Sequence, residues 1–340
     1  MNLPVKRIWL GLMATLFLAT CNLPQEEAIG GGDVIMVLSE DENWEIAEPI
    51  LTGSLGRIVR TPQNESLYEF VRITPDQLEA NLKIKNLVIL TRLEVHSEIS
   101  GQVRSMLPDS TLNRIRESQT GIYLRANAYA AGQALMIVAA KNPPDLRNRL
   151  RENQDAIFNF FENKFLEREE AFVYRSGEQR EMAEGYYEKY GWYLRMMHTF
   201  VEIVDNPAQQ FVWWGRDLPI RWLTISWMDP VDTLDLQASA HVLLERTYGT
   251  LLSDVQLNRD YLLEEEVWFK EYSAYRLSGL WESKEEVKGG PFAGYVFYEP
   301  EKDRIYFLNG LVFAPDRRKV PYIRQLETIM HSFATQPYEE

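Results

Sequence analysis

The residue with the clearest chemical role in this sequence is Cys21, the only cysteine among 340 residues. It ends the string Leu18-Ala19-Thr20-Cys21. This string is typical of a bacterial lipobox, in which cleavage at small residues leaves the cysteine to be acylated. Several acyl chains, at about 0.8 kcal/mol for each buried methylene, make such an attachment effectively permanent. Cys21 is therefore the predicted site of lipid attachment.

The segment before Cys21 has the parts of a secretory signal peptide. Lys6 and Arg7 form a positive start, and residues 8–18 form an apolar core. That core is too short to cross a bilayer as a helix, which takes about 20 residues. We therefore expect residues 1–20 to be removed. An ordinary cleaved signal followed by an incidental cysteine is the alternative to lipid attachment.

The composition predicts a folded, acidic body. Hydrophobic residues make up 45% of the chain, aromatic residues 12% and charged residues 25%, unlike a disordered protein. The formal charge is −14, and losing Lys6 and Arg7 with the signal would make it −16. An acidic surface repels phosphate groups, which argues against nucleic acid and against direct adhesion to anionic lipid. The membrane is thus an expected partner only through the anchor.

The chain after the signal divides into a tether and two halves. Residues 21–32 include three consecutive glycines and predict a flexible lipidated tether. No Gly-Lys-Ser or Gly-Lys-Thr follows these glycines, which argues against a phosphate-binding loop. Residues 33–190 and 191–340 are each expected to pair helices with a mixed or antiparallel sheet. The predicted fold class is α+β rather than doubly wound, with two fused α/β-sandwich-like halves.

Apolar runs and turn signals predict the elements of both halves. In the first half, strands are expected at 33–38, 67–73, 87–91, 122–127 and 134–140, with one broken helical segment at 44–58 and a long helical stretch at 142–172. In the second half, strands are expected at 198–204, 211–215, 222–227, 268–280, 293–298 and 304–313, with helices at 234–252 and 320–333.

No group of residues has the spacing of a known catalytic or metal site. The histidines lie far apart and lack the spacing of zinc ligands: His96, His198, His241 and His331. The string Gly53-Ser54-Leu55-Gly56 lacks the spacing of a serine nucleophile elbow. We therefore predict no catalytic residue, no metal and no cofactor.

Carboxylates beside tryptophans suggest one enzymatic alternative, an activity on sugars. The acidic candidates are Asp229, Asp232, Asp235, Glu282, Glu285 and Glu286, and the aromatic candidates are Trp213, Trp214, Trp222, Trp227, Trp268 and Trp281. Turns and helix caps explain the acids without catalysis, and strand alternation predicts that most of the tryptophans face a core. A glycan-binding or glycan-processing protein is the alternative function.

The loop Gly289-Gly290-Pro291 is the strongest candidate for a binding surface. Two glycines before a proline suit either a tight strand entry, which we favour, or close approach of a ligand to the backbone. The residues expected to converge there are Trp281, Glu282, Gly289, Gly290, Phe292, Arg259 and Asp260. Arg259 and Asp260 fit a structural ion pair equally well. Trp222 has the opposite strand parity to its apolar neighbours and is a further surface candidate.

Several of these strings resemble one protein family. Gly279-Leu280-Trp281-Glu282 and the later Gly289-Gly290-Pro291-Phe292 are similar to a family of Bacteroidetes-type envelope lipoproteins catalogued as domain of unknown function 4837. Further matching strings, which extend the resemblance over nearly the whole mature chain, are Arg259-Asp260-Tyr261, residues 310–315, Gln325-Leu326-Glu327 and Ala131-Gly132-Gln133. The resemblance implies a lipid-anchored envelope protein and no known activity. The closing strands and helix also resemble the Mog1/PsbP-type sandwich.

Together these observations predict a non-enzymatic, lipid-anchored binding or assembly module of the cell envelope. Asn22 after the acylated cysteine, in place of Asp, favours the outer membrane. The body is then expected to face the periplasm or the exterior, and other envelope proteins are its expected partners.

Overall fold

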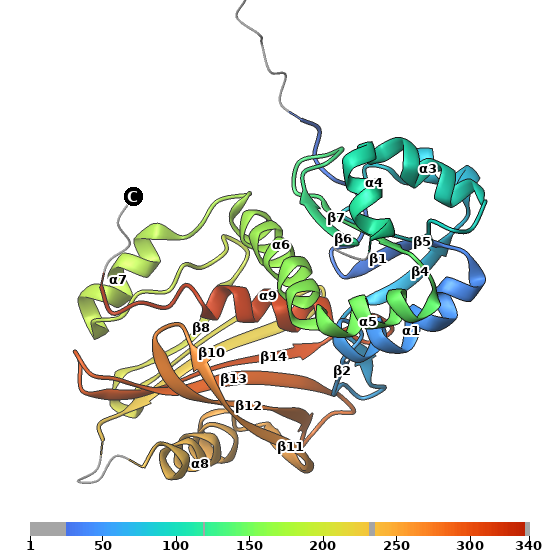
Figure 1. Ribbon diagram of the computed structural model, residues 1–340. Coiled ribbons are helices and arrows are strands. Elements are labelled where there is room, and N and C mark those ends of the chain that lie inside the picture. Colours follow the sequence, from blue (N-terminus) through green and yellow to red (C-terminus); the bar gives the residue numbers. More distant parts are fainter. Residues whose placement is uncertain (1–24, 118–119, 231–234, 337–340) are drawn as a thin grey trace, which may run out of the picture.

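The computed structural model describes residues 25–117, 120–230 and 235–336 (Figure 1). Its two large β-sheets have five and seven strands, and a small hairpin, β2 (Ile58–Val59) with β3 (Glu65–Ser66), lies apart from both. Cys21, the signal segment and Asp232 lie outside the described residues. The strands of the five-stranded sheet lie within residues 33–190, and those of the seven-stranded sheet lie within residues 191–340.

The first sheet has the order β4-β1-β5-β7-β6. Its strands are β1 (Val34–Ser39), β4 (Glu69–Ile73), β5 (Asn86–Arg92), β6 (Ile122–Ala126) and β7 (Ala134–Ala140). The pairs β1–β4, β1–β5 and β5–β7 are parallel, and β6 runs antiparallel to β7. Every residue of β5 and of β7 is buried. The predicted mixed sheet is therefore confirmed.

Helices cover both faces of this first sheet. On one face lie α1 (Asp41–Ser54), α5 (Pro143–Glu152) and α6 (Gln154–Tyr174), which share a hydrophobic core with Val88 and Leu90 of β5. On the other lie η1 (Pro75–Gln77), α2 (Leu78–Asn81), α3 (Glu98–Met106) and α4 (Asp109–Arg116), whose core includes Leu87 and Ile89. This three-layer, largely parallel arrangement is of the doubly wound kind, contrary to our expectation. Central parallel strands are buried on both faces, so their sequence loses the alternation that distinguishes sheet types.

The second sheet is antiparallel throughout, in the order β11-β12-β13-β14-β10-β9-β8. Its strands are β8 (Val201–Asn206), β9 (Phe211–Arg216), β10 (Ile220–Met228), β11 (Val255–Phe269), β12 (Tyr272–Ser283), β13 (Gly289–Glu299) and β14 (Arg304–Phe313). A short 3-10 turn, η2 (Pro207–Gln209), joins β8 to β9. The predicted antiparallel sheet of the second half is confirmed.

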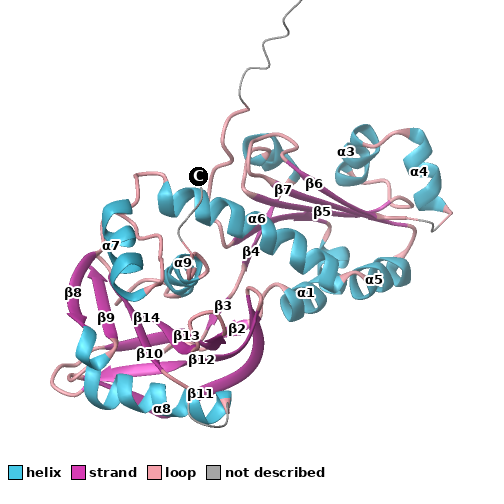
Figure 2. Ribbon diagram, turned by 90° about the vertical axis from the view of Figure 1, so that its left-hand side faces the viewer, coloured by secondary structure: helices cyan, strands magenta, loops and turns pink. Residues whose placement is uncertain are grey.

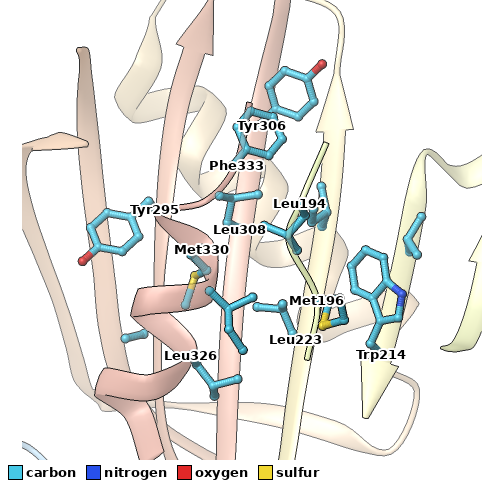
Figure 3. Packing of buried hydrophobic residues seen from close by; sticks show 14 of the residues in the cluster. Leu194, Met196, Trp214, Leu223, Tyr295, Tyr306, Leu308, Leu326, Met330 and Phe333 are labelled. Atoms are coloured by element: carbon cyan, nitrogen blue, oxygen red, sulfur yellow. The ribbon is translucent and has the colours of Figure 1, made fainter. Parts of the chain in front are cut away.

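The second sheet also lies between two helical layers (Figure 2). α7 (Arg180–Tyr190) and α9 (Val320–Met330) cover one face, and α8 (Leu236–Arg246), followed by the helical turn η3 (Thr247–Leu251), covers the other. Figure 3 shows Leu326 and Met330 of α9 against Leu223 and Leu308 of the sheet. The central strands of this sheet are therefore buried on both faces, whereas the edge strands β8 and β11 keep exposed side chains.

The core of the second sheet also includes residues before the expected division at residue 190. Tyr186 on α7 stacks on Trp192 with ring centroids 5.1 Å apart, and both belong to the same cluster as Leu308. The expected boundary at residue 190 therefore separates α7 from the second sheet, although α7 packs on that sheet.

The expected single strand over residues 268–280 is wrong, because the chain turns there. β11 ends at Phe269 and β12 begins at Tyr272. The missed strand β11 carries exposed glutamates, residues 264–266, and has no apolar alternation to mark it. It is an edge strand, where charged side chains are tolerated and prevent pairing with other chains.

Two helical predictions also differ from the structure. The long helix expected after Asn142 is divided into α5 and α6 at Asn153, whereas the segment expected to break at Pro49 is the continuous helix α1. Packing of Trp44 and Leu51 against the sheet outweighs the local cost of the proline. None of the helices in the described residues is long and apolar enough to cross a bilayer.

The expected flexible tether is shorter than the sequence suggests, because residues 26–29 pack on the first half. The amide of Ala28 donates to the carbonyl of Ala131 at 2.9 Å. Glu26 forms a 2.7 Å ion pair with Lys83. Both contacts join residues that are far apart in the sequence, so the glycine-rich composition of this segment does not predict them.

Candidate functional site

Helix α9 belongs to the second half but is held at its start by the first. The carboxylate of Glu65 on β3 accepts hydrogen bonds from the backbone amides of Lys319, at 2.7 Å, and Val320, at 3.0 Å. These amides begin the helix and have no helical partners, so a carboxylate there acts as a cap. The guanidinium of Arg318 also donates to the carbonyl of Ser66 at 2.6 Å. The hairpin of the first half thus fixes where α9 begins.

A second connection joins α9 to α6. Arg324 is only 5% exposed and donates to the carboxylate of Glu162 at 2.6 Å. Its guanidinium lies 3.2 Å from the ring centroid of Phe165. Tyr68 donates from its hydroxyl to the same carboxylate at 3.1 Å. The Nη1 atom of Arg324 is buried and has no hydrogen-bond partner among the described residues.

Beside this connection lies a cavity of about 630 Å³, which we call the α6–α9 cleft. A volume of this size is typical of small-molecule sites. Its walls come from α6, from α9 and from the second sheet. The lining residues are Glu162, Leu166, Glu170, Tyr174, Tyr193, Arg195, Lys270, Tyr295, Arg324, Glu327, Thr328, His331, Ser332, Ala334 and Gln336.

Glu327 is the central charged group on the α9 wall of the cleft. One oxygen of its carboxylate accepts hydrogen bonds from Nη2 of Arg276 at 2.8 Å and from the hydroxyl of Tyr295 at 3.1 Å. One turn further on, Nδ1 of His331 lies 2.7 Å from the carbonyl of Glu327. Because a carbonyl only accepts, Nδ1 carries the proton and Nε2 is the nitrogen that remains for a ligand.

Several cleft residues have pKa values that the protein shifts further from pH 7. Burial alone would raise the pKa of Glu327, but the charge and hydrogen bonds of Arg276 outweigh it, and the pKa is lowered. Burial raises the pKa of Tyr174 to about 12, and burial together with the charge of Glu327 raises that of Tyr295. Burial alone would lower the pKa of Arg324, but its interactions with Tyr68 and with the carboxylate of Glu162 outweigh it, and the pKa is raised. These groups therefore keep one protonation state near pH 7.

The other wall of the cleft is also charge-paired. Arg195 forms ion pairs with Glu178 at 2.7 Å and with Glu170 at 3.1 Å, and its guanidinium stacks 3.7 Å from the ring centroid of Tyr174. Leu166 on α6 adds an apolar contact surface and is 44% exposed. The cleft thus combines paired charges with aromatic and aliphatic surface.

The predicted surface at Gly289-Gly290-Pro291 is a feature of strand packing. A Cβ on Gly290 would lie 2.0 Å from the carbonyl oxygen of Val312, and one on Gly289 would lie 2.6 Å from that of Trp281. The indole of Trp281 crosses Gly290 and donates to the Val312 carbonyl at 3.2 Å. Trp281 and Phe292 are buried beneath α8. The tight strand entry, the interpretation that the sequence favours, therefore explains both glycines.

The remaining predicted binding residues lie near that entry without forming a common site. Arg259 forms a 2.5 Å ion pair with Glu245 on α8. The expected partner, Asp260, does not form this pair. Glu282 is exposed and accepts a hydrogen bond from Gln256. Trp222 is half-buried and contacts the rings of Trp213 and Trp281. Its side chain lies on the sheet face that α8 covers, so it is not a free surface residue. These residues are part of the sheet and its rim.

Most of the candidate sugar-stacking tryptophans lie in the cores. Trp214, Trp227 and Trp281 are at most 3% exposed, whereas Trp268 is 75% exposed on the edge strand β11. No tryptophan is among the residues that line the α6–α9 cleft. Within the described ranges, no three His, Cys, Asp or Glu side chains are grouped as metal ligands.

The residues of the cleft are ones that sequence reasoning did not select. Glu162 and Arg324 are 162 positions apart, and neither belongs to a motif. One signal was present: arginine and glutamate occur at Arg324 and Glu327 within an otherwise apolar helix face. Charged residues on such a face need partners, and they point to a junction between two cores.

Comparison with known proteins identifies two regions of this mixed α/β chain. Residues 253–332 match the family model described as domain of unknown function DUF4837, and residues 28–173 match one described as DUF8532. The second half of the chain is therefore similar to the DUF4837 family, as its sequence resemblance predicts. The match is narrower than expected: Ala131-Gly132-Gln133 falls in the DUF8532 region. The DUF4837 region contains the α9 wall of the cleft and the DUF8532 region contains most of α6.

Two solved structures match part of the chain. A mutant of protein Mog1 and the Saccharomyces cerevisiae Ran-binding protein Mog1p each cover 43% of this chain and 90% of their own. Sequence identities are 10% and 11%, and both TM-scores are 0.30. No curated protein matches the sequence.

Proposed function

We propose that this protein is a lipid-anchored, non-enzymatic binding or assembly module of the cell envelope, and that the α6–α9 cleft receives its partner. One observation carries the choice of site. The acidic side chains that line the cleft, Glu162, Glu170 and Glu327, each pair with an arginine. Charges that are already paired, in a cavity of ligand size, favour binding of a polar partner. They do not favour acid–base catalysis, in which a side chain gains or loses a proton.

The pKa shifts also favour binding over catalysis. A general acid or base works best with a pKa near the operating pH. In the cleft, the pKa of Glu327 is lowered and those of Tyr174 and Tyr295 are raised, so each keeps one protonation state near pH 7. Fixed charges and rigid aromatic rings instead suit a preorganised binding site.

Lipid attachment at Cys21 is supported by the sequence of the signal and by the position of the sole cysteine. The Cys21→Ser variant should lose palmitate labelling and move from the membrane to the soluble fraction. Continued labelling of this variant would reject the assignment. We place the anchor in the outer membrane, with the body facing the periplasm or the exterior, and we expect envelope proteins as partners and no nucleic acid.

A glycan-binding or glycan-processing role is the less favoured alternative. It relies on exposed tryptophans, and Trp268, the strongly exposed one among the described residues, lies on β11 and outside the cleft lining. Binding of soluble envelope glycan fragments, lost on Trp268→Ala and retained when the cleft is filled, would favour this alternative.

The test of the binding site is site-specific photocrosslinking in living cells. A photoreactive residue replaces Leu166 in the cleft or, as a control of similar exposure, Val242 on α8. We expect a discrete protein adduct at position 166 that is absent at position 242. Thr328→Trp, which fills the cleft, should abolish this adduct while the circular dichroism spectrum is unchanged. Equal adducts at both positions, or an adduct that survives Thr328→Trp, would refute the cleft as the site.

A further inference from the structure

The segment that leads from the proposed anchor is fixed to one face of the first half. Glu27 forms a 2.9 Å ion pair with Arg175, directly after the end of α6. The amide of Ile29 donates to the carbonyl of Lys83 at 3.0 Å, and the amide of Lys85 donates to the carbonyl of Ile29 at 2.9 Å. Residues 26–29 are thus part of the folded body.

Only five residue steps separate Cys21 from Glu26. An extended chain advances at most about 3.6 Å for each residue, so this connection spans about 18 Å or less. The expected radius of gyration of a 340-residue domain is about 20 Å. A connection shorter than the size of the body restricts which face can approach the membrane.

We infer that the face around residues 26–29 and the carboxyl end of α6 lies against the lipid surface. The inference rests on the proposed lipid attachment at Cys21. This face presents two apolar side chains, Ile29 at 58% exposure and Phe172 at 54%. Phe172 precedes Arg175 by three positions, the spacing that places side chains on the same side of a helix. Apolar side chains of this kind enter the headgroup region of a bilayer.

The arrangement directs the rest of the molecule away from the lipid. In Figures 1 and 2, α8 lies at the opposite end of the molecule from the first described residues. The α6–α9 cleft is nearer the membrane, because Tyr174, which lines it, is the last residue of α6. A partner of the cleft would then be bound close to the lipid surface.

The test uses single introduced cysteines, because Cys21 is the only native one. Full-length lipidated protein with Ile29→Cys, Phe172→Cys or Val242→Cys is labelled with a fluorophore and reconstituted in phosphatidylethanolamine and phosphatidylglycerol vesicles. Nitroxide-headgroup lipids then serve as quenchers. We expect quenching at positions 29 and 172 to exceed that at position 242, on α8, at least threefold. Val242 is 52% exposed, so the three sites are matched in accessibility.

Vesicle flotation distinguishes failure of the proposed orientation from failure of the proposed lipid anchor. Protein that floats with the vesicles but shows equal quenching at positions 29, 172 and 242 would overturn the orientation and leave the anchor intact. Protein that does not float would overturn the proposed anchor and the orientation with it. The Cys21→Ser variant, which should remain at the bottom of the gradient, defines that second outcome.

Discussion

Arg324 on α9 and Glu162 on α6 form a 2.6 Å ion pair that joins the two halves of this protein. The arginine is almost fully buried, and the aromatic ring of Phe165 covers its guanidinium. Together with Glu65, which caps the start of α9, this pair links a largely parallel sheet to an antiparallel one. The proposed binding cleft is formed at this junction.

Removal of the Arg324 side chain should destabilise the protein strongly. Arg324→Met leaves the partly buried carboxylate of Glu162 without its ion-pair partner, and breaking a buried pair in this way costs about 3–5 kcal/mol. Urea unfolding measures the change. Arg259→Met is the matched control, because its pair with Glu245 is exposed and worth about 1 kcal/mol or less. Equal losses in the two variants would contradict the role of the buried pair.

The ion pair of Glu327 with Arg276 should make stability depend on pH in the acid range. The pKa of Glu327 is lowered in the folded state, so its contribution is complete above the ordinary value of 4.5. It is lost as the pH falls through the lower, folded-state pKa.

Unfolding midpoints of the protein and of Glu327→Gln should therefore differ most at pH 7. The difference should narrow as the pH falls from about 5 to about 3, since the unfolded carboxyl titrates near its ordinary value of 4.5. A difference that widens toward acid would show that Glu327 is not held ionised by Arg276.

Gly290→Ala should severely destabilise or prevent folding of the second half. Its new methyl group would lie 2.0 Å from the backbone oxygen of Val312, and the strand backbone cannot move away without breaking the sheet. Gly185→Ala on α7 is the control, since nothing lies within 4 Å of the position that its methyl group would take. In a helix this change should add about 0.5–1 kcal/mol. A thermal midpoint for Gly290→Ala at or above that of the unmodified protein would refute the packing argument.

Trp268 should account for most of the tryptophan fluorescence that iodide can quench. Its side chain is 75% exposed, whereas Trp192, Trp214 and Trp281 are at most 1% exposed. In protein that begins at residue 21, Trp268→Phe should therefore reduce the Stern–Volmer slope severalfold, and Trp281→Phe should leave the slope unchanged. A large slope that persists in Trp268→Phe would show that a second tryptophan reaches solvent.

Strands with a strong local signal were predicted close to their observed limits. The runs at residues 134–140 and 304–313 match β7 and β14. An apolar run between turn signals predicts a strand without information from the rest of the fold. β11 was missed because three exposed glutamates interrupt its pattern at the sheet edge. The parallel pairing of β1 with β5 was missed because both strands are buried on two faces.

The sequence by itself determined the acidic composition, the mixed α/β content and the DUF4837 resemblance, and it predicts the lipobox at Cys21, since composition and short motifs are local properties. Only the tertiary structure decided where the candidate site lies. Glu162 and Arg324 meet because α6 and α9 pack together, and no local pattern encodes a contact between positions 162 residues apart. The same holds for residues 26–29, whose composition is that of a linker and whose partners are distant in sequence. Contacts of this kind depend on the whole fold, which is why they became visible only in three dimensions.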